Sequence, residues 1–348
     1  MILKFNKIIL LVLILAVAIS FSTVNASELN NSTLTDSSQS IIYVDALGDD
    51  LNDGSIAHPV KTLNQALNKS SDGTTILIGD GIYSGENNSK IVLNKSVSIV
   101  GAKNTTFDGL GQNHILIITD NAKVTLKNIN FINAYKSQTS FGVNYNQNVY
   151  GAAIEIKSAE VSIDGCRFEN NIINYQNLNV FGGAISNFGN LTITDSLFKS
   201  NVARATSGLF SFGGAIYNKA ILTINSTVFS DSLGDNYAYG VGIANDGDLT
   251  ISASTFKHLK SSQESRGSAI YNTGNLTLAD SVVEDNSIAK SNFQYIYGAV
   301  YNSGKMIAYN NIFRNNTGVY SNPSKGSPTI YNVGEIDLKY NFFRNNQA

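Results

Sequence analysis

Six asparagines recur at intervals of 27 to 31 residues in the second half of the chain, and each stands two positions after an aliphatic residue. The six are Asn187, Asn218, Asn245, Asn272, Asn302 and Asn332. A side-chain amide both donates and accepts hydrogen bonds, and amides stacked at the strand spacing of roughly 4.7–4.8 Å bond to one another, as in cross-β ladders. Asparagine also tolerates the left-handed backbone of a sharp corner. Because the column repeats, we interpret it as a structural ladder at a corner rather than as a ligand site.

Aromatic side chains gather in the segments between repeats, where asparagine, serine and glutamine flank them. Such rings can stack on sugars or anchor a protein partner. The candidates for glycan or partner binding are Tyr175, Phe212, Tyr237, Tyr239, Tyr295 and Tyr297. The alternative is that these rings pack on each other and cover the flank of the fold.

The carboxylates of the repeats do not share one column. Polysaccharide hydrolysis or elimination needs converging carboxylates, or an acidic cluster beside an arginine or lysine. The acids in the repeats are Asp164, Glu169, Asp195, Asp231, Asp248, Glu284, Asp285 and Asp337, and Arg167 stands near Asp164. The histidines His58, His114 and His258 are scattered. We therefore expect no catalytic residue, no metal site and no cofactor, with a polysaccharide lyase or glycoside hydrolase as the alternative.

These residues belong to an internal repeat. Its aliphatic anchors are Ile154, Ile185, Ile216, Ile243, Ile270, Val300 and Ile330, spaced by 31, 31, 27, 27, 30 and 30 residues. A period of this size marks a repeat architecture. After each anchor comes an alternating stretch such as Leu191-Thr192-Ile193, and then a column of large residues. That column reads Phe168, Phe198, Phe229, Phe256, Val283, Phe313 and Phe343.

Alternation with a period of two indicates strands, so each repeat supplies three short strands. One repeat cannot bury its own apolar face, but stacked repeats can, with each strand paired in parallel to its counterpart. The sequence therefore predicts an all-β chain coiled as a parallel β-helix. We expect nine or ten coils, a rod roughly 45 Å long. Cys166 falls in a serine and threonine column, which makes it a small core residue.

Composition and the N-terminus indicate an extracellular compartment. Residues 1–26 resemble a secretory signal peptide, with Lys4 and Lys7 before an apolar run and small residues before the cleavage site. Residues 27–40 are polar and predicted to be a disordered linker. Cleavage removes two lysines and no acids, which leaves a net charge of −4. This mild acidity argues against nucleic acid as a partner, and no second apolar run is long enough for a transmembrane span.

Residues 41–348 form the predicted β-helix domain, with an N-terminal cap at 41–74, irregular coils at 75–150 and regular repeats at 151–348. Within the cap, 62–69 is predicted to be a short amphipathic helix that begins near Thr62 and covers the first coil. The acidic stretch 45–54 fails the EF-hand spacing, because Leu51 stands where an acid is needed. We interpret it as a tight turn, with calcium binding as the alternative.

The segments "IIYVDALGDDLNDGS", "DGTTILIGDGIYSG" and "GGAI-x-N-x-G-x-L-T-I-x-x-S-x-F" resemble the adhesin-like surface proteins of methanogenic archaea. They are also similar to the repeats of chlamydial polymorphic outer-membrane proteins. Both families belong to the pectin-lyase-like superfamily, so the resemblance implies a right-handed β-helix. It further implies a secreted or cell-surface rod whose partners are extracellular glycans or surface proteins. A purely structural cell-wall component is a further alternative. No covering helix follows Phe343, which leaves end-to-end stacking open at the C-terminus.

Overall fold

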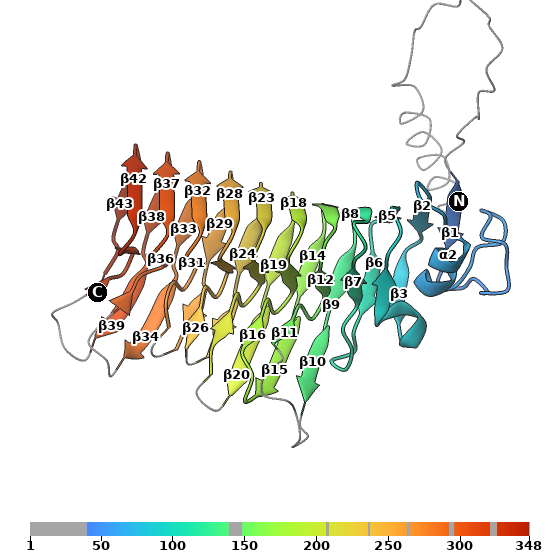
Figure 1. Cartoon of the computed structure of the whole chain (residues 1–348), viewed down its shortest axis with the longest axis horizontal. Helices are drawn as coiled ribbons and strands as arrows, with labels where there is room; N and C mark the ends of the chain where they lie inside the picture. Colours follow the sequence, from blue (N-terminus) through green and yellow to red (C-terminus); the bar gives the residue numbers. More distant parts are fainter. Residues whose placement is uncertain are drawn as a thin grey trace, which may run out of the picture. The chain divides into compact units, whose positions relative to one another are not determined.

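The computed structural model describes residues 40–138, 148–206, 209–235, 237–262, 265–291, 296–320 and 326–347 (Figure 1). Residues 1–39, which hold the predicted signal peptide and nearly all of the predicted linker, lie outside the described residues. Within the described part, no helix combines the length and the apolar character that crossing a membrane requires.

Three long parallel sheets run the length of the coil stack. Sheet A contains β1 (Ile41–Val44), β2 (Thr75–Ile78), β5 (Ser98–Gly101), β8 (Lys123–Lys127), β13 (Glu160–Asp164), β18 (Asn190–Thr194), β23 (Ile221–Asn225), β28 (Asp248–Ser252), β32 (Asn275–Ala279), β37 (Lys305–Tyr309) and β42 (Glu335–Lys339). Sheet B contains β3 (Gly81–Ser84), β6 (Thr105–Asp108), β9 (Asn130–Ile132), β14 (Arg167–Glu169), β19 (Leu197–Lys199), β24 (Val228–Ser230), β29 (Thr255–Lys257), β33 (Val282–Glu284), β38 (Ile312–Arg314) and β43 (Phe342–Arg344). Sheet C contains β4 (Ile91–Leu93), β7 (Leu116–Ile118), β12 (Ile154–Ile156), β17 (Ile185–Asn187), β22 (Ile216–Asn218), β27 (Ile243–Asn245), β31 (Ile270–Asn272), β36 (Val300–Asn302) and β41 (Ile330–Asn332).

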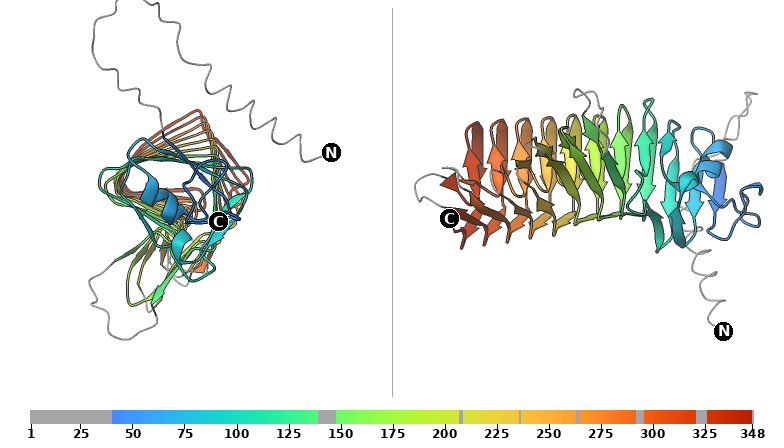
Figure 2. Two further views of the ribbon diagram at one scale, coloured as in Figure 1. Left: turned by 90° about the vertical axis from the view of Figure 1, so that its right-hand side faces the viewer. Right: turned by 90° about the horizontal axis from the view of Figure 1, so that it is seen from below.

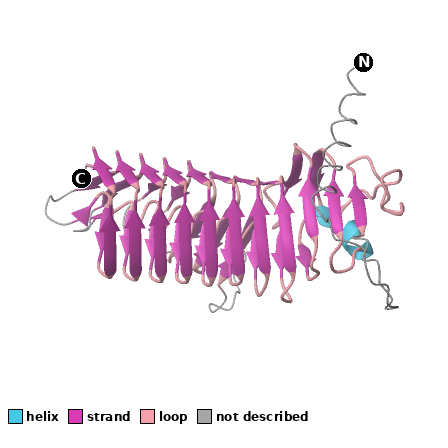
Figure 3. Ribbon diagram, turned by 90° about the horizontal axis from the view of Figure 1, so that it is seen from above, coloured by secondary structure: helices cyan, strands magenta, loops and turns pink. Residues whose placement is uncertain are grey.

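Like residues lie above like residues in each sheet. Ile216 pairs with Ile185 on one side and with Ile243 on the other, because every strand of sheet C is in parallel register with its neighbours. Seen from above, the strands of the successive coils lie side by side in parallel rows (Figure 3). The predicted right-handed parallel β-helix is confirmed, with about nine turns and one short helix near its N-terminal end.

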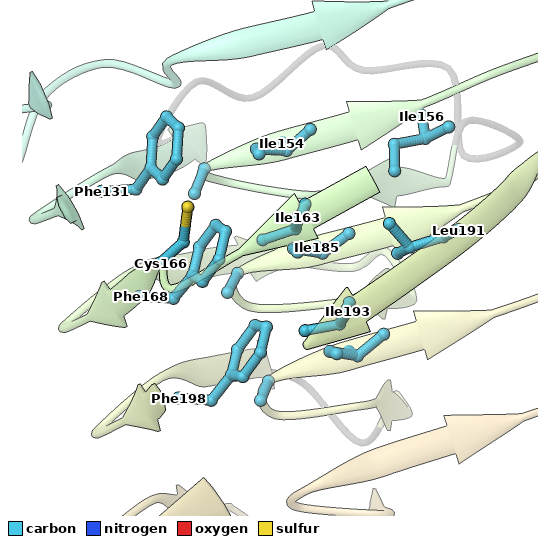
Figure 4. Packing of buried hydrophobic residues seen from close by; sticks show 14 of the residues in the cluster. Phe131, Ile154, Ile156, Ile163, Cys166, Phe168, Ile185, Leu191, Ile193 and Phe198 are labelled. Atoms are coloured by element: carbon cyan, nitrogen blue, oxygen red, sulfur yellow. The ribbon is translucent and has the colours of Figure 1, made fainter. Parts of the chain in front are cut away.

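The core is built around a stack of phenylalanines on the inner face of sheet B. The rings of Phe131, Phe168 and Phe198 follow one another, with centroids 5.1 and 4.7 Å apart (Figure 4). Aliphatic side chains of sheets A and C, including Ile163 and Ile185, pack against them and are fully buried. The stack begins earlier than the repeats suggest, since Phe107 and Tyr83 extend it toward the N-terminus.

Inward polar ladders line all three corners of the coil. At the turn from sheet C to sheet A, the amides of the predicted asparagine column bond from coil to coil at 2.6–2.8 Å. Between sheets A and B, the backbone N–H of Thr227 donates to Ser254 Oγ at 3.1 Å, and Cys166 occupies this column as a buried residue. A third ladder follows sheet B, where Asn286 Nδ2 donates to Asn316 Oδ1 at 3.0 Å. We did not predict this third ladder from the sequence.

The N-terminal end carries the predicted helix, α2 (Leu63–Lys69), which packs against β1 and the 3-10 turn η1 (Glu86–Asn88). Thr62 Oγ1 accepts a hydrogen bond from Gln65 N at 3.3 Å, which caps the first turn. Lys95 Nζ donates to the Leu67 and Ser70 carbonyls at 2.8 Å and so satisfies the other end. In the acidic stretch before the helix, Asp50 accepts the backbone N–H groups of Lys61 and Thr62 at 2.9 Å. Among the described residues, no group of three or more acidic, histidine or cysteine side chains is placed to hold a metal.

The segments between sheets B and C form a lobe that projects from one side of the coil stack (Figure 2). Its short strands are β10 (Tyr135–Gln138), β11 (Val149–Tyr150), β15 (Ile172–Gln176), β16 (Val180–Phe181), β20 (Val202–Thr206), β21 (Ser211–Phe212), β25 (Leu233–Gly234), β26 (Ala238–Tyr239), β30 (Lys260–Ser261), β34 (Ser287–Ser291), β35 (Ile296–Tyr297), β39 (Thr317–Tyr320) and β40 (Gly326–Ser327). They also pair in parallel from coil to coil. The lobe therefore extends the coil and places its own side chains in columns.

Candidate functional site

Two outward columns of aromatic side chains meet where the lobe returns to sheet C. The first, which we call the rim column, lies at the end of the lobe and contains Tyr150, Phe181, Phe212, Tyr239, Arg266 and Tyr297. The second lies on the outer face of sheet C, one residue after each anchor, and its aromatic members are Tyr217, Tyr271, Tyr301 and Tyr331. We call the two columns together the aromatic seam. Its six coil-to-coil steps give a length of roughly 30 Å.

A glycine turn brings the two columns together. The residue after each rim position is a glycine, and at Gly213, Gly240 and Gly267 its φ is close to +70°. A Cβ on Gly213 would lie 2.0 Å from the carbonyl oxygen of Ile216, so a side chain cannot be accommodated there. The first glycine of each "GGAI" phrase therefore folds the rim column onto sheet C.

The rings of the seam pack on one another over its whole length. Phe181 and Phe212 stack with centroids 5.0 Å apart and planes 5° from parallel. Tyr239 stacks on Tyr271 at 4.9 Å, and Tyr271 stacks on Tyr301 at 5.1 Å. Tyr217, Tyr271 and Tyr301 of sheet C are more than nine-tenths buried, whereas Tyr331, Phe212, Tyr239 and Tyr297 are half-buried. Phe212, Tyr239 and Tyr297 thus pack on protein over part of their surface and are exposed over the rest, whereas Phe181 of the rim column is buried.

The structure brings together only part of the aromatic set predicted from the sequence. Phe212, Tyr239 and Tyr297 belong to the seam. Tyr237 lies beside it, in edge contact with Phe210 at 5.6 Å. Tyr175 packs against the main core from the lobe, and Tyr295 lies outside the described residues.

Sequence reasoning missed the sheet C tyrosines and Arg266. The tyrosines occupy the middle of the triplets Ile-Tyr-Asn and Val-Tyr-Asn, between an inward anchor and an inward asparagine. Because neighbouring strand residues point to opposite faces, the middle residue faces outward. Strand alternation would have identified this column. Arg266 gives no such signal, because its coil carries a cation where the neighbouring coils carry a ring.

Burial raises the pKa of two tyrosine hydroxyls in the sheet C column. Burial raises the pKa of Tyr271 to about 12. The pKa of Tyr217 is also raised, first by burial and then by its hydrogen bond to Asp246 Oδ2 at 2.7 Å. Asp246 has two further partners, Thr273 Oγ1 at 2.6 Å and Lys219 Nζ at 3.7 Å. These tyrosines therefore stay neutral at ordinary pH, and their hydroxyls serve as hydrogen-bonding groups.

No protein-family model matches this sequence, and no curated protein matches it. Among solved structures, the chain is similar to the pectate lyase Pel9A, at 15% identity over 87% of this chain and 79% of that chain, with a TM-score of 0.44. A rhamnogalacturonan lyase matches at 13% identity over 86% of this chain and 87% of that chain, with a TM-score of 0.41. The GH136 lacto-N-biosidase from Eubacterium ramulus matches at 12% identity over 88% of this chain and 68% of that chain, with a TM-score of 0.34.

This chain has a parallel β-helix fold. That statement rests on its own strand pairing, because similarities at this level carry no argument about what the chain binds or transforms.

Most carboxylates of the repeats are paired with cations or amides of the same or neighbouring coils. Asp164, which the sequence places near Arg167, lies 2.6 Å from Lys127 Nζ, and Arg167 instead binds Glu169. Asp248 Oδ1 accepts a hydrogen bond from Asn275 at 2.7 Å. The contacts Asp164–Lys127 and Asp248–Asn275 follow the strand register and tie adjacent coils together, whereas Arg167–Glu169 lies within one strand. Among the described acids of sheets A and B, we find no pair converging on a shared cleft.

A buried ion pair lies at the N-terminal end of the seam. Lys136 Nζ of β10 is 3.2 Å from Glu155 Oε2 of β12 and 2.5 Å from the Tyr150 carbonyl, and both charged side chains are less than 15% exposed. Burial lowers the pKa of Lys136, and Glu155 opposes that shift. Burial, together with Lys136 and Lys90, lowers the pKa of nearby His114 to about 4. The pair fastens the first lobe strand to sheet C.

A separate polar groove of about 450 Å³ crosses the outer face of sheet A over β5, β8, β13 and β18. Its walls include the hydroxyls of Ser98, Thr125, Ser162 and Thr192, and none of its lining residues is aromatic. Because this groove is polar and lacks aromatic rings, a variant that obstructs it can serve as a control for binding at the seam.

Proposed function

We propose that this chain is a secreted or cell-surface, adhesin-like β-helix rod that binds glycans along the aromatic seam. The observation that carries the proposal is the row of half-buried rim rings, fixed at the coil spacing by the packed tyrosines beneath them. Rings with one packed side and one exposed side present an apolar surface at little conformational cost. Sugar rings have apolar faces of matching size, and the polar edges of the tyrosines lie close by.

The extended form of the seam favours a chain-like ligand. The rim positions repeat at the coil spacing over five steps, roughly 24 Å, so successive sugars would meet successive rim side chains. The described acids of sheets A and B support binding rather than bond cleavage, since their partners are neighbouring side chains. The resemblance of the repeats to adhesin-like surface proteins agrees with this proposal.

Tyrosine fluorescence gives a direct assay, because the chain contains 17 tyrosines and no tryptophan. We would titrate the recombinant protein with cellohexaose, chitohexaose and xylohexaose, and compare the wild type with the double variant Tyr239→Ala/Tyr297→Ala. We expect at least one hexasaccharide to bind the wild type. Loss of two anchoring rings should weaken that binding by at least about tenfold.

Two matched controls locate the site. Tyr340→Ala removes an exposed tyrosine outside the seam, and its binding should equal that of the wild type. Thr192→Lys obstructs the polar groove of sheet A and should also bind normally. If none of the hexasaccharides binds, or if Thr192→Lys abolishes binding while the double variant retains it, the proposed function at the seam is wrong.

A further inference from the structure

Arg266 interrupts the rim column at a position where the flanking coils carry tyrosine. Its backbone bridges Tyr239 on one side and Tyr297 on the other, so its side chain takes the place of a ring in the column. The guanidinium carbon lies 5.2 Å from the Tyr239 ring centroid, 5.0 Å from that of Tyr297 and 5.4 Å from that of Tyr301. Three rings therefore hold one half-buried cation by cation–π contacts.

The surroundings of Arg266 differ from those of several other cations in the repeats. Lys127, Lys136 and Arg314 each lie within ion-pair distance of a carboxylate. For Arg266, no ion pair with a described carboxylate is present, and the contacts observed are with rings. Asp246, in the coil of Tyr239, is engaged by Tyr217, Thr273 and Lys219.

The backbone also fixes Arg266 in place. Its N–H donates to the Ala238 carbonyl at 3.0 Å, and its carbonyl accepts from Gly240 N at 3.0 Å. Gly267 then turns the chain into sheet C, with φ +68°. A planar guanidinium stacked on rings keeps its N–H edges for in-plane hydrogen bonds, which match the oxygen pairs of a carboxylate or sulfate. Because the rings hold it in advance, little side-chain entropy is lost when an anion binds.

We propose that Arg266 is the specificity-determining residue of the seam and seats an anionic group, a carboxylate or a sulfate ester, of a sugar chain stacked on the neighbouring tyrosines. This inference rests on the proposed glycan binding and adds the charge of the ligand to it. The rings on either side recognise the apolar faces of the sugars, and Arg266 selects the chain that carries a negative charge at that position.

The test uses three chains with one backbone: cellohexaose, its C6-carboxylated form and its C6-sulfated form. At low salt, we expect at least one of the two anionic chains to bind the wild type at least tenfold more tightly than cellohexaose. That advantage should shrink as sodium chloride screens the charges. Comparing the affinities of the carboxylated and the sulfated chain shows which anion the site accepts.

Arg266→Tyr is the matched variant, because it restores the ring that the neighbouring coils carry and removes the charge. It should keep the melting temperature and lose the preference for the anionic chains. Arg266→Lys should retain part of that preference, since a lysine keeps the charge without the planar fork. Equal affinity of the wild type for all three chains would overturn the inference, and so would an anion preference that survives in Arg266→Tyr. If either overturning outcome is found while cellohexaose binds, glycan binding stands and only the role of Arg266 is rejected.

Discussion

Two sets of aromatic rings repeat along this molecule at the coil spacing: the phenylalanine stack on the inner face of sheet B and the aromatic seam on the outside. They differ in how regularly their rings pack. Inside, Phe198, Phe229 and Phe256 stack with centroids 4.7–4.8 Å apart and planes within 7° of parallel. In the seam, neighbouring rings range from stacked to edge-on, as at Phe212 and Tyr239, whose planes differ by 69°. Strand pairing sets the spacing of both columns, whereas burial on all sides imposes parallel rings only on the inner one.

The two columns also tolerate different interruptions. The inner stack is broken at Val283, a fully buried aliphatic residue between Phe256 and Phe313. The seam is broken at Arg266, a cation that stacks on the rings beside it. An uncompensated charge inside the coil would incur a large desolvation penalty, but the seam faces water on one side. The inner column therefore contributes mainly to stability, and the outer one is free to carry recognition.

Removing one ring from each column should give the largest contrast. Phe198→Ala deletes a fully buried side chain between two stacked rings and leaves a cavity, which should cost about 3–5 kcal/mol of unfolding free energy. Tyr297→Ala removes a half-buried ring whose space water can enter, so we expect a loss of about 1 kcal/mol. Urea unfolding followed by circular dichroism measures both. Equal losses would mean that the seam is as much part of the core as the phenylalanine stack.

How much of this contrast the sequence could reveal depends on where each column lies in the repeat. The inner column follows its anchor at a nearly constant distance, so Phe168, Phe198 and Phe229 align by eye. Asn218 and its counterparts align for the same reason. The asparagine corner and the three sheets were predictable from these regularities, and the helix at 63–69 from its own apolar pattern and cap, whereas the third polar ladder was not predicted.

The seam was harder to predict because it joins residues from segments whose separation varies. Tyr239 stacks on Tyr271, which lies 32 residues further along the chain, and the repeats between anchors differ by up to four residues. The outward column of sheet C is also irregular, since Ser186 precedes its first tyrosine and Ala244 separates Tyr217 from Tyr271. The contacts of Arg266 depend on three coils at once, so periodicity in one coil could not indicate them.

The asparagine ladder allows a second, smaller contrast within a single column. Asn218 Nδ2 donates to Asn245 Oδ1 at 2.7 Å, and its Oδ1 accepts from Asn187 at 2.8 Å, in a fully buried corner. Asn218→Ala removes a partner from both neighbours and leaves one buried N–H of Asn187 unsatisfied, which should cost about 1–3 kcal/mol. Asn332 stands at the exposed end of the same ladder, so water can replace its contacts. Asn332→Ala should therefore change the urea midpoint less, and a larger effect there would contradict a role for burial.

The smallest expected effect is on the pH dependence of stability at the N-terminal end of the seam. There the buried pair Lys136–Glu155 takes the place of stacked rings, and His114 lies nearby. His114 has a folded pKa of about 4, below its ordinary value of 6.5, because burial and two nearby lysines disfavour its charged form. As pH falls below about 6.5, the unfolded chain takes up this proton first, so stability declines until pH reaches about 4 and the folded chain is protonated too. The loss should be modest, because water reaches part of the imidazole and screens the lysines.

His114→Gln should flatten the thermal-stability profile between pH 6.5 and 4 relative to the wild type. An unchanged slope in His114→Gln would assign the acid sensitivity to the carboxylates that tie the coils together.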